Sequence, residues 1–536
     1  MITSQSQQVP VNLVGSSIFG RYPKISAEKT YNMFISTSGE NEWLVNYAGW
    51  KKIIDLSDNG EGRAVFRSIR NNIVVAVVGN VVWAIDSGFD YNFVGTILSS
   101  SGDVFIDENL SDQICIVDGL NAYIYNPLMG SLTIQSLNSN LLPNYVIYHN
   151  TFFIFGNATT TGNGAKWYVY SFESATTITE TSELALQTKP DYAIAVQRLP
   201  GQSNNIIVFG TSVSEIWTNV GGLSNYQRNS SVSVDYGCLS PSTIASSDKY
   251  VIWLGVNESN SPVITLFSPS TGSQSISTDG IDYQLGLLKY PEQSTAFFYR
   301  DDGHLFYQIT FYNAADNLSL IYDVDTKKFF HVSDWNLNYH PARNVVYFNN
   351  NVYFVSLNNG SFYQTSTTIT TYDENIEYSS VYDESNHEIP RSRVCSSIRR
   401  PDSSRFMANN LFVTIDQGNE AAFSTANLTE QADFLVSEEG VQLASEDGQL
   451  LTAEDSSAFG ESGYTIPYIP RVDLSISKDG GVAFSNTVGV NLRPIGYRKN
   501  MLKWQRQFGL SNDLTLKFRF WTKGNVCVWN GVIDVY

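Results

Sequence analysis

An acidic segment near the C-terminus has the spacing of a repeated ligand set. Residues 429–460, TEQADFLVSEEGVQLASEDGQLLTAEDSSAFG, hold eight acids and no Lys or Arg. Four glutamates recur at the same position of successive octads: Glu430, Glu438, Glu446 and Glu454. Because calcium prefers carboxylate and other oxygen ligands, this period first suggests a cation site.

A short β meander explains the octads better than a calcium site or a disordered tail. A calcium loop such as D-x-D-x-D-G makes its ligands converge, whereas the adjacent acids of SEEG and SEDG diverge on an extended chain. The regularly placed Phe, Leu and Val exceed what a disordered segment usually carries. Gly440 and Gly448 lie where turns benefit from positive φ. The sequence therefore predicts short strands whose acidic turns form a docking or lumen surface, without a metal.

A second candidate for chemistry is SKDGGVAF, residues 477–484, which fits the Asp-box pattern of sialidase propellers. We expect a structural hairpin, in which Asp479 caps its own turn and Phe484 packs beneath it. Hydrolysis of a glycosidic bond needs paired carboxyl groups, or an equivalent nucleophile, at a fixed separation. The sequence selects no such pair. A carbohydrate-binding or glycan-hydrolysing propeller therefore stays the alternative, and we predict that the protein is not an enzyme.

Motifs for nucleophilic, phosphate-binding or metal chemistry are missing from the sequence. It has no GxSxG elbow, no P-loop and no dinucleotide fingerprint, and its five histidines lack ligand spacing. The four cysteines lie more than a hundred residues apart: Cys115, Cys238, Cys395 and Cys527. We expect buried free thiols in a reducing compartment. The sequence thus predicts no catalytic, cofactor-binding or metal-binding residues.

Five arginines form the one basic concentration of the chain, in PRSRVCSSIRRPDSSRF, residues 390–406. They are Arg391, Arg393, Arg399, Arg400 and Arg405. One interpretation is a solvated linker whose arginines pair with local acids. The other is an interface patch, because arginine forks suit an acidic partner or a neighbouring subunit. Both interpretations stay open at this point.

Composition and charge favour an all-β protein that does not wrap nucleic acid. Charged residues make up 16 % of the chain, and Tyr 31, Phe 30 and Trp 10 are high counts. Aromatic residues favour strands, and Asn, Gly and Ser favour tight turns. The net charge of −19 disfavours binding around duplex DNA, which requires cations to replace counterions. A conduit with like-charged walls would still let DNA slide.

Hydropathy and the N-terminus indicate neither a membrane span nor a signal peptide. The longest apolar runs are shorter than the 18 residues that a membrane helix requires. The N-terminal MITSQSQQVPVNLVG has no basic region followed by an apolar stretch. We therefore expect neither a cleaved signal peptide nor a membrane-spanning helix.

A strand–turn–aromatic strand pattern repeats along residues 60–370. NIVVAVVGNVVWAID and STAFFYRDDGHLFYQITF are two examples. The turns are expected near Gly79, Gly119, Gly156, Gly210, Gly255, Gly303 and Gly360. Their spacing of roughly 40–55 residues is typical of propeller blades. Since a single four-stranded sheet cannot bury both faces, the units must stack radially, which predicts a β-propeller of six or seven blades.

The rhythm changes after residue 370, and period-two alternation indicates a second antiparallel β domain. NNLFVTIDQG, DLTLKFRFWT and VCVWNGVIDVY are examples of its strands. We expect an N-terminal segment, 1–55, that packs on the C-terminal domain or closes the propeller. The propeller would span 56–380, and a β-sandwich-like platform 381–536 would carry the acidic meander at 429–460.

The order of several motifs resembles the tail hub or nozzle proteins of short-tailed bacteriophages, which include packaged-DNA stabilisation and tail accessory proteins. The matching stretches are VFGTSVSEIWTNVGG, VDYGCLSPSTIASSDKYVIWLG, SISTDGID, LSLIYDVDTKKFFHVSDW and KNMLKWQRQFGLSNDLTLKFRFW. The resemblance runs over most of the chain. It departs from the family at Ala48, where a proline is usual, and at the octads, which are not part of the shared pattern.

The resemblance implies a structural virion protein of the phage tail, assembled in the host cytoplasm. Such proteins form a homohexameric ring below the portal and its adaptor protein, extend the DNA channel and help to retain packaged DNA. They dock tail fibre, spike or needle proteins and let phage DNA pass transiently without specific contacts. The resemblance implies no catalytic residues and no cofactor.

Overall fold

The computed structural model describes residues 7–56, 60–159, 162–221, 225–376, 385–417, 470–492 and 501–536. Within these ranges the chain is almost entirely β, with one α-helix, α1 (Asp279–Leu285), and a short 3-10 helix at Pro241–Thr243. The predicted all-β class is confirmed. The search of the described residues for a helix long and apolar enough to cross a membrane found none. The octads, with Glu430, Glu438, Glu446 and Glu454, lie outside the described residues.

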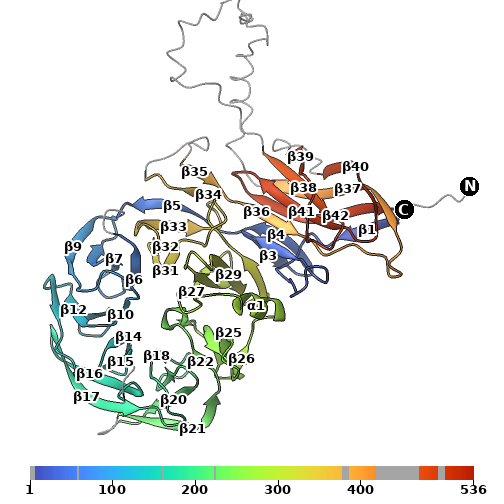
Figure 1. The fold of residues 1–536 in the computed structure, drawn as a ribbon. Coiled ribbons are helices and arrows are strands. Elements are labelled where there is room, and N and C mark those ends of the chain that lie inside the picture. Colours follow the sequence, from blue (N-terminus) through green and yellow to red (C-terminus); the bar gives the residue numbers. More distant parts are fainter. Residues whose placement is uncertain are drawn as a thin grey trace, which may run out of the picture.

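Four consecutive blades of a β-propeller follow the chain in simple order (Figure 1). Each is an antiparallel sheet of four successive strands. They are β6 (Gly62–Ser68), β7 (Ile73–Val78), β8 (Val81–Ile85) and β9 (Tyr91–Thr96); β10 (Phe105–Glu108), β11 (Ile114–Val117), β12 (Ala122–Asn126) and β13 (Ser131–Ile134); β14 (Pro143–His149), β15 (Phe152–Asn157), β16 (Lys166–Ser174) and β17 (Thr177–Ala185); β18 (Ala195–Arg198), β19 (Asn205–Phe209), β20 (Ser214–Asn219) and β21 (Tyr226–Val234).

Three further blades complete the ring and recruit extra strands. The fifth is β22 (Gly237–Cys238), β23 (Ala245–Ser246), β24 (Val251–Val256), β25 (Pro262–Ser268) and β26 (Gly272–Ser275). The sixth is β27 (Ser294–Asp301), β28 (His304–Phe311), β29 (Leu318–Asp323) and β30 (Lys328–His331). The seventh is β31 (Ala342–Phe348), β32 (Asn351–Ser356), β33 (Phe362–Ser366) and β5 (Gly49–Ile54). The described residues therefore form seven blades, one of the two numbers that the repeat allowed.

Two kinds of glycine account for the repeated pattern in the blades. Gly79, Gly119, Gly303 and Gly360 have positive φ and lie at turns, as the repeat predicted. Gly156 and Gly255 lie inside strands β15 and β24, close to the ends of these strands, whereas Gly210 lies in the loop between β19 and β20, where the repeat predicted a turn. A Cβ at Gly156 would press against the backbone of residues 194 and 195 in the neighbouring blade. Close packing between blades, and not turn geometry, explains a glycine there.

The N-terminal segment is divided between the propeller and the C-terminal sheets. β5 is the outermost strand of the seventh blade, antiparallel to β33, and it also pairs with β34 (Thr371–Asp373), which pairs with β35 (Asn386–Glu388). Most of the other strands of the segment join C-terminal strands in a six-stranded sheet: β1 (Gln7–Val11), β3 (Met33–Ser38), β4 (Asn41–Asn46), β37 (Phe406–Gln417), β40 (Met501–Ser511) and β42 (Val526–Val535). The boundaries at 55 and 380 stay a prediction.

One nine-stranded sheet connects the propeller to the C-terminal region. The outer strand of the sixth blade, β30, pairs in parallel with β2 at His331 and Tyr31, and β2 pairs with β36. The sheet continues in the order β2 (Lys29–Tyr31), β36 (Arg391–Val394), β41 (Thr515–Trp521), β38 (Arg471–Ser477) and β39 (Val488–Asn491). Blade and platform therefore share backbone hydrogen bonds.

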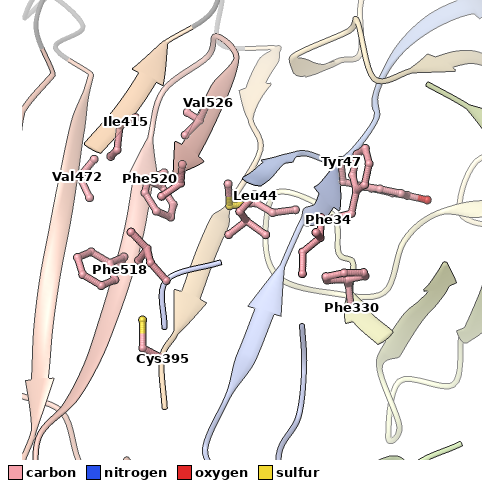
Figure 2. Packing of buried hydrophobic residues seen from close by; sticks show 14 of the residues in the cluster. Phe34, Leu44, Tyr47, Phe330, Cys395, Ile415, Val472, Phe518, Phe520 and Val526 are labelled. Atoms are coloured by element: carbon pink, nitrogen blue, oxygen red, sulfur yellow. The ribbon is translucent and has the colours of Figure 1, made fainter. Parts of the chain in front are cut away.

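A single hydrophobic core lies at this junction (Figure 2). It includes Phe330 of the sixth blade, Phe34 and Leu44 of the N-terminal strands, and Phe518 and Val526 of the C-terminal strands. All five are at most 1 % exposed. Burying a side chain of this size contributes about 1.5–3 kcal/mol each. The shared core and the shared sheet hold the propeller and the platform together.

Candidate interaction surfaces

Arg393 is buried inside the subunit and does not belong to an exposed patch. It is 0 % exposed on β36. Its Nη2 donates to Glu28 Oε2 at 2.6 Å, and its Nη1 donates to the carbonyl oxygen of Ser16 at 2.7 Å and to Thr30 Oγ1 at 3.1 Å. Gly15 packs against the guanidinium, where a Cβ would clash. The arginine thus clamps the segment that leads into β2, and its predicted interface role is corrected.

Arg391 is corrected in the same way. It is also 0 % exposed, and its Nη1 donates to the carbonyl oxygen of Thr522 at 2.7 Å. Its Nη2 donates to the carbonyl oxygen of Thr370 at 2.9 Å, so it joins the end of the seventh blade to the platform. Residues two apart on a strand share a face. Both arginines therefore point to the buried face of β36, where hydrogen bonds to carbonyl oxygens offset the cost of burial.

The other three predicted arginines lie at the surface, in the connection between β36 and β37. The Arg399 side chain is 42 % exposed, and its Nε donates to Asp513 Oδ2 at 2.9 Å. Arg400 is half-buried, and its Nη1 donates to the carbonyl oxygen of Arg405, which is exposed. Surface ion pairs contribute only about 0–1 kcal/mol. These three side chains therefore remain available to a partner at little cost to the fold.

A histidine and two aspartates form the one potential metal-ligand group among the described residues. His304 Nδ1 lies 2.9 Å from Asp323 Oδ2, which also accepts from Thr326 Oγ1 at 2.7 Å. Asp325 accepts from the backbone N–H of Leu305 at 2.9 Å. The two carboxylates thus already accept hydrogen bonds that tie the turn between β29 and β30 to the start of β28. The geometry fits a structural brace.

His304 should make stability depend on pH. The hydrogen bond to Asp323 raises the pKa of the imidazole above 6.5. Its stabilisation is therefore fully present below pH 6.5 and is lost as pH rises through the raised pKa. We expect the gap in urea midpoint between the wild type and His304→Gln to narrow from pH 6 to pH 9. The other histidines titrate equally in both proteins, and a constant gap would contradict the prediction.

The inner strands of all seven blades surround a central cavity of about 280 Å³. Apolar residues such as Val65 and Ile147 line it, but its exposed lining surface is more polar than apolar and includes Arg63, Arg198 and Arg343. Asp107 is the one carboxylate among the described lining residues; Arg198 lies 3.1 Å from it. Burial raises the pKa of Asp107. One carboxylate paired with an arginine does not supply the two acids of glycoside hydrolysis, so the cavity gives the glycosidase alternative no support.

The Asp box is a structural turn, as its residue types predicted. Asp479 accepts hydrogen bonds from the backbone N–H groups of Val482 and Ala483 at 3.0 Å, and Gly480 has φ of 77°. Hydrogen bonds, above all from Ser477, hold the pKa of Asp479 below its usual range. The hydrogen bonds that this carboxylate accepts come from its own loop, including one from Ser477 Oγ, so the box shapes the loop beside β38.

Comparison with known proteins places the propeller in a family. A family model described as "Bacteriophage P22 Gp10, beta-propeller" matches residues 31–370, which include all seven blades. The chain belongs to the bacteriophage P22 Gp10 propeller family. Gp10-type proteins are phage structural proteins associated with the tail. Membership therefore supports a virion location and favours a structural role over a catalytic one.

Two of the solved structures that match the chain do so at low identity and with low TM-scores. A streptogramin B lyase structure is 11 % identical, with a TM-score of 0.39, and the match covers 60 % of this chain and 97 % of that one. Virginiamycin B lyase from Staphylococcus aureus, in a catalytically inactive form with quinupristin, is 10 % identical, with a TM-score of 0.40 and coverage of 60 % and 99 %. The search of curated proteins gave no match.

One charged surface was missed by the sequence analysis. Lys517, Arg519 and Trp521 alternate with Phe518 and Phe520 along β41, and the phenylalanines are buried. Since alternate residues of a strand face opposite sides, the two cations and the indole share the outward face of the nine-stranded sheet. The period-two alternation of KFRFW carried this signal, but the sequence analysis used it only to predict a strand.

Proposed function

We propose that this Gp10-family protein is a ring-forming hub or nozzle of a short phage tail. In this role a homohexamer extends the DNA channel of the portal and its adaptor, helps to retain packaged DNA and docks fibres, spikes or a needle. The observation that carries the proposal is the family match over residues 31–370. The shared sheet and core also support it, because a ring that carries other proteins requires subunits that transmit load between their parts.

Charge is consistent with a conduit for DNA. Each copy adds a net charge of −19. Walls of the same sign as the phosphates hold DNA weakly, so that it can slide during ejection. The contacts to neighbours would use local cations, and the surface residues Arg399, Arg400 and Arg405 are candidates for a contact with an acidic subunit or adaptor surface.

Replacing Arg399 and Arg400 together with Glu tests this contact. We expect a folded monomer that fails to enter tails, because two charge reversals oppose an acidic partner whereas the surface location leaves folding intact. The copy number in purified virions, measured by quantitative immunoblot, should fall at least about tenfold. Lys249→Glu, at an exposed site on the propeller, is the matched control. Normal incorporation of the double variant would refute the assigned interface.

A further inference from the structure

The outward face of the nine-stranded sheet presents cations in strand register. Lys29 of β2 and Lys517 of β41 both lie opposite Val394 of β36, so the two lysines share one row. Arg519 lies in the next row, and Arg471 of β38 lies opposite Trp521 in the row after it. Directly paired residues point to the same face. These four cations therefore form one surface, which we call the cationic face.

Lys29 and Lys517 make no hydrogen bond or ion pair to a carboxylate among the described residues, whereas Arg519 is attracted by the nearby carboxylates of Glu388 and Asp473. Each of these three cations lies over an aromatic ring: Arg519 over Trp521 at 3.6 Å from the ring centroid, Lys517 over Phe484 at 5.5 Å, and Lys29 over Phe19 at 4.9 Å. A guanidinium stacked flat on an indole keeps its N–H groups free to bind carboxylates in its own plane.

The positive charges of the cationic face repel each other. Burial, and next the charge of Lys517, lowers the pKa of Lys29. Asp473, whose Oδ2 accepts from Trp521 Nε1 at 2.7 Å and whose Oδ1 lies 3.3 Å from Arg471, and Glu388 offset part of the charge near Arg519 but leave the two lysines unpaired within the described residues. An anionic ligand would remove this repulsion.

The distances between the cations favour a ligand that carries several carboxylates. Lys29 and Lys517 are two strands apart, which corresponds to about 10 Å, and Arg519 is about 7 Å along the strand from Lys517. A single small anion cannot contact all three. A chain that carries many acids can, and the aromatic rings beneath the cations offer apolar contacts to its other side chains.

An acidic chain of this kind is attached to the same sheet. Residues 418–469 contain ten Asp and Glu and no Lys or Arg. This segment follows β37 of the six-stranded sheet, and its C-terminal end, residue 469, lies two residues before Arg471 of the cationic face. Because it is tethered there, its effective concentration is of the order of mM, whereas a free polyanion would first meet a chain of net charge −19.

We propose that the cationic face binds the acidic octads, residues 429–460, of the same chain. Carboxylates of the octads accept hydrogen bonds from Arg519 and form ion pairs with Lys517 and Lys29. This inference is independent of the proposed tail function, because it concerns contacts within one chain.

Zero-length carbodiimide crosslinking of the full-length protein tests the proposal. The reagent joins a lysine Nζ to a carboxylate in an amide, and mass spectrometry of the digest identifies the pair. We expect amides from Lys517 or Lys29 to glutamates of the octads, at least about tenfold more abundant than amides from Lys503. Lys503 is the matched control, an exposed lysine that lies over the Phe412 ring on the other sheet.

Variants and isotope mixing complete the test. Arg519→Glu should lower the Lys517 crosslinks about tenfold, the effect of losing one charged hydrogen bond, and Arg519→Gln should lower them less. An unchanged thermal midpoint shows that both variants fold. Equal crosslink yields at Lys517 and Lys503 would overturn the proposal. Crosslinks between isotopically labelled and unlabelled copies of the protein in a mixture would also overturn it, because they would join two different molecules. A third result would overturn it as well: a labelled single-stranded DNA binds the wild type but not the Arg519 variants, and no crosslink from Lys517 or Lys29 to the octads forms. The cationic face would then bind DNA and not the octads.

Discussion

Arg393→Ala should lower the free energy of unfolding by about 3–5 kcal/mol, because it leaves the partner of a buried ion pair without its counter-charge. Glu28 Oε2 would lose the 2.6 Å hydrogen bond from Nη2. The carbonyl oxygen of Ser16 would lose its donor as well, and a cavity would open beside Gly15. The segment before β2 would then lose its anchor to β36. Urea unfolding followed by near-UV circular dichroism measures the effect.

Arg405→Ala is the control for this prediction, since it removes an exposed arginine from the same stretch. It should change stability by no more than about 0.5 kcal/mol. Arg393→Lys should lie between the two, because an ammonium keeps the charge but cannot reproduce the fork. A loss below about 1 kcal/mol for Arg393→Ala would show that the buried contacts do not hold this part of the fold.

Trp50→Ala should destabilise the protein by a similar amount, about 3–5 kcal/mol, as for other buried large aromatic side chains. Trp50 is 0 % exposed on β5 and stacks on Tyr372 with ring centroids 3.5 Å apart and an interplanar angle of 12°. Its Nε1 donates to Glu374 Oε1 at 3.1 Å. Because β5 completes the seventh blade, the change loosens the closure of the ring. Differential scanning calorimetry should show a lower midpoint.

Trp529→Ala is the matched control for ring closure. Trp529 is 54 % exposed on β42, so its loss should stay within about 0.5 kcal/mol. Limited proteolysis gives an independent readout, since a loosened seventh blade should be cut near β5 and β33 before the other blades. Equal stability of the two tryptophan variants would contradict the role of β5 in closing the propeller.

Local signals allowed the β class and the blades to be predicted from the sequence. Tight turns favour glycines such as Gly303, with φ of 82°, and aromatic strands flank these turns. Each hairpin can therefore be recognised from its own short stretch of sequence. Strand pairings across the chain leave no such local signal. The N-terminal β5 pairs with β33 some three hundred residues later, and β2 inserts between β30 and β36. Composition and period cannot reveal these pairings.

The five arginines of residues 390–406 also show which features the sequence predicts and which depend on strand pairing. Five arginines in one stretch predicted a patch, yet register sends Arg391 and Arg393 to the core and leaves Arg399, Arg400 and Arg405 outside. Arg391 and Arg393 are buried because the pairing of β36 with β41 on one edge and β2 on the other turns both side chains to the covered face of the sheet. The same residue type thus serves as an internal clamp or as a surface contact, and only the strand pairing decides between them.

The most direct test of the central claim is cryo-electron microscopy of intact virions of the phage that encodes this chain. The proposed hub predicts six copies in a closed ring below the portal and its adaptor, with the propeller and platform each recognisable in the density. A virion whose tail lacks this chain, or that carries it as isolated copies away from the DNA channel, would contradict the account.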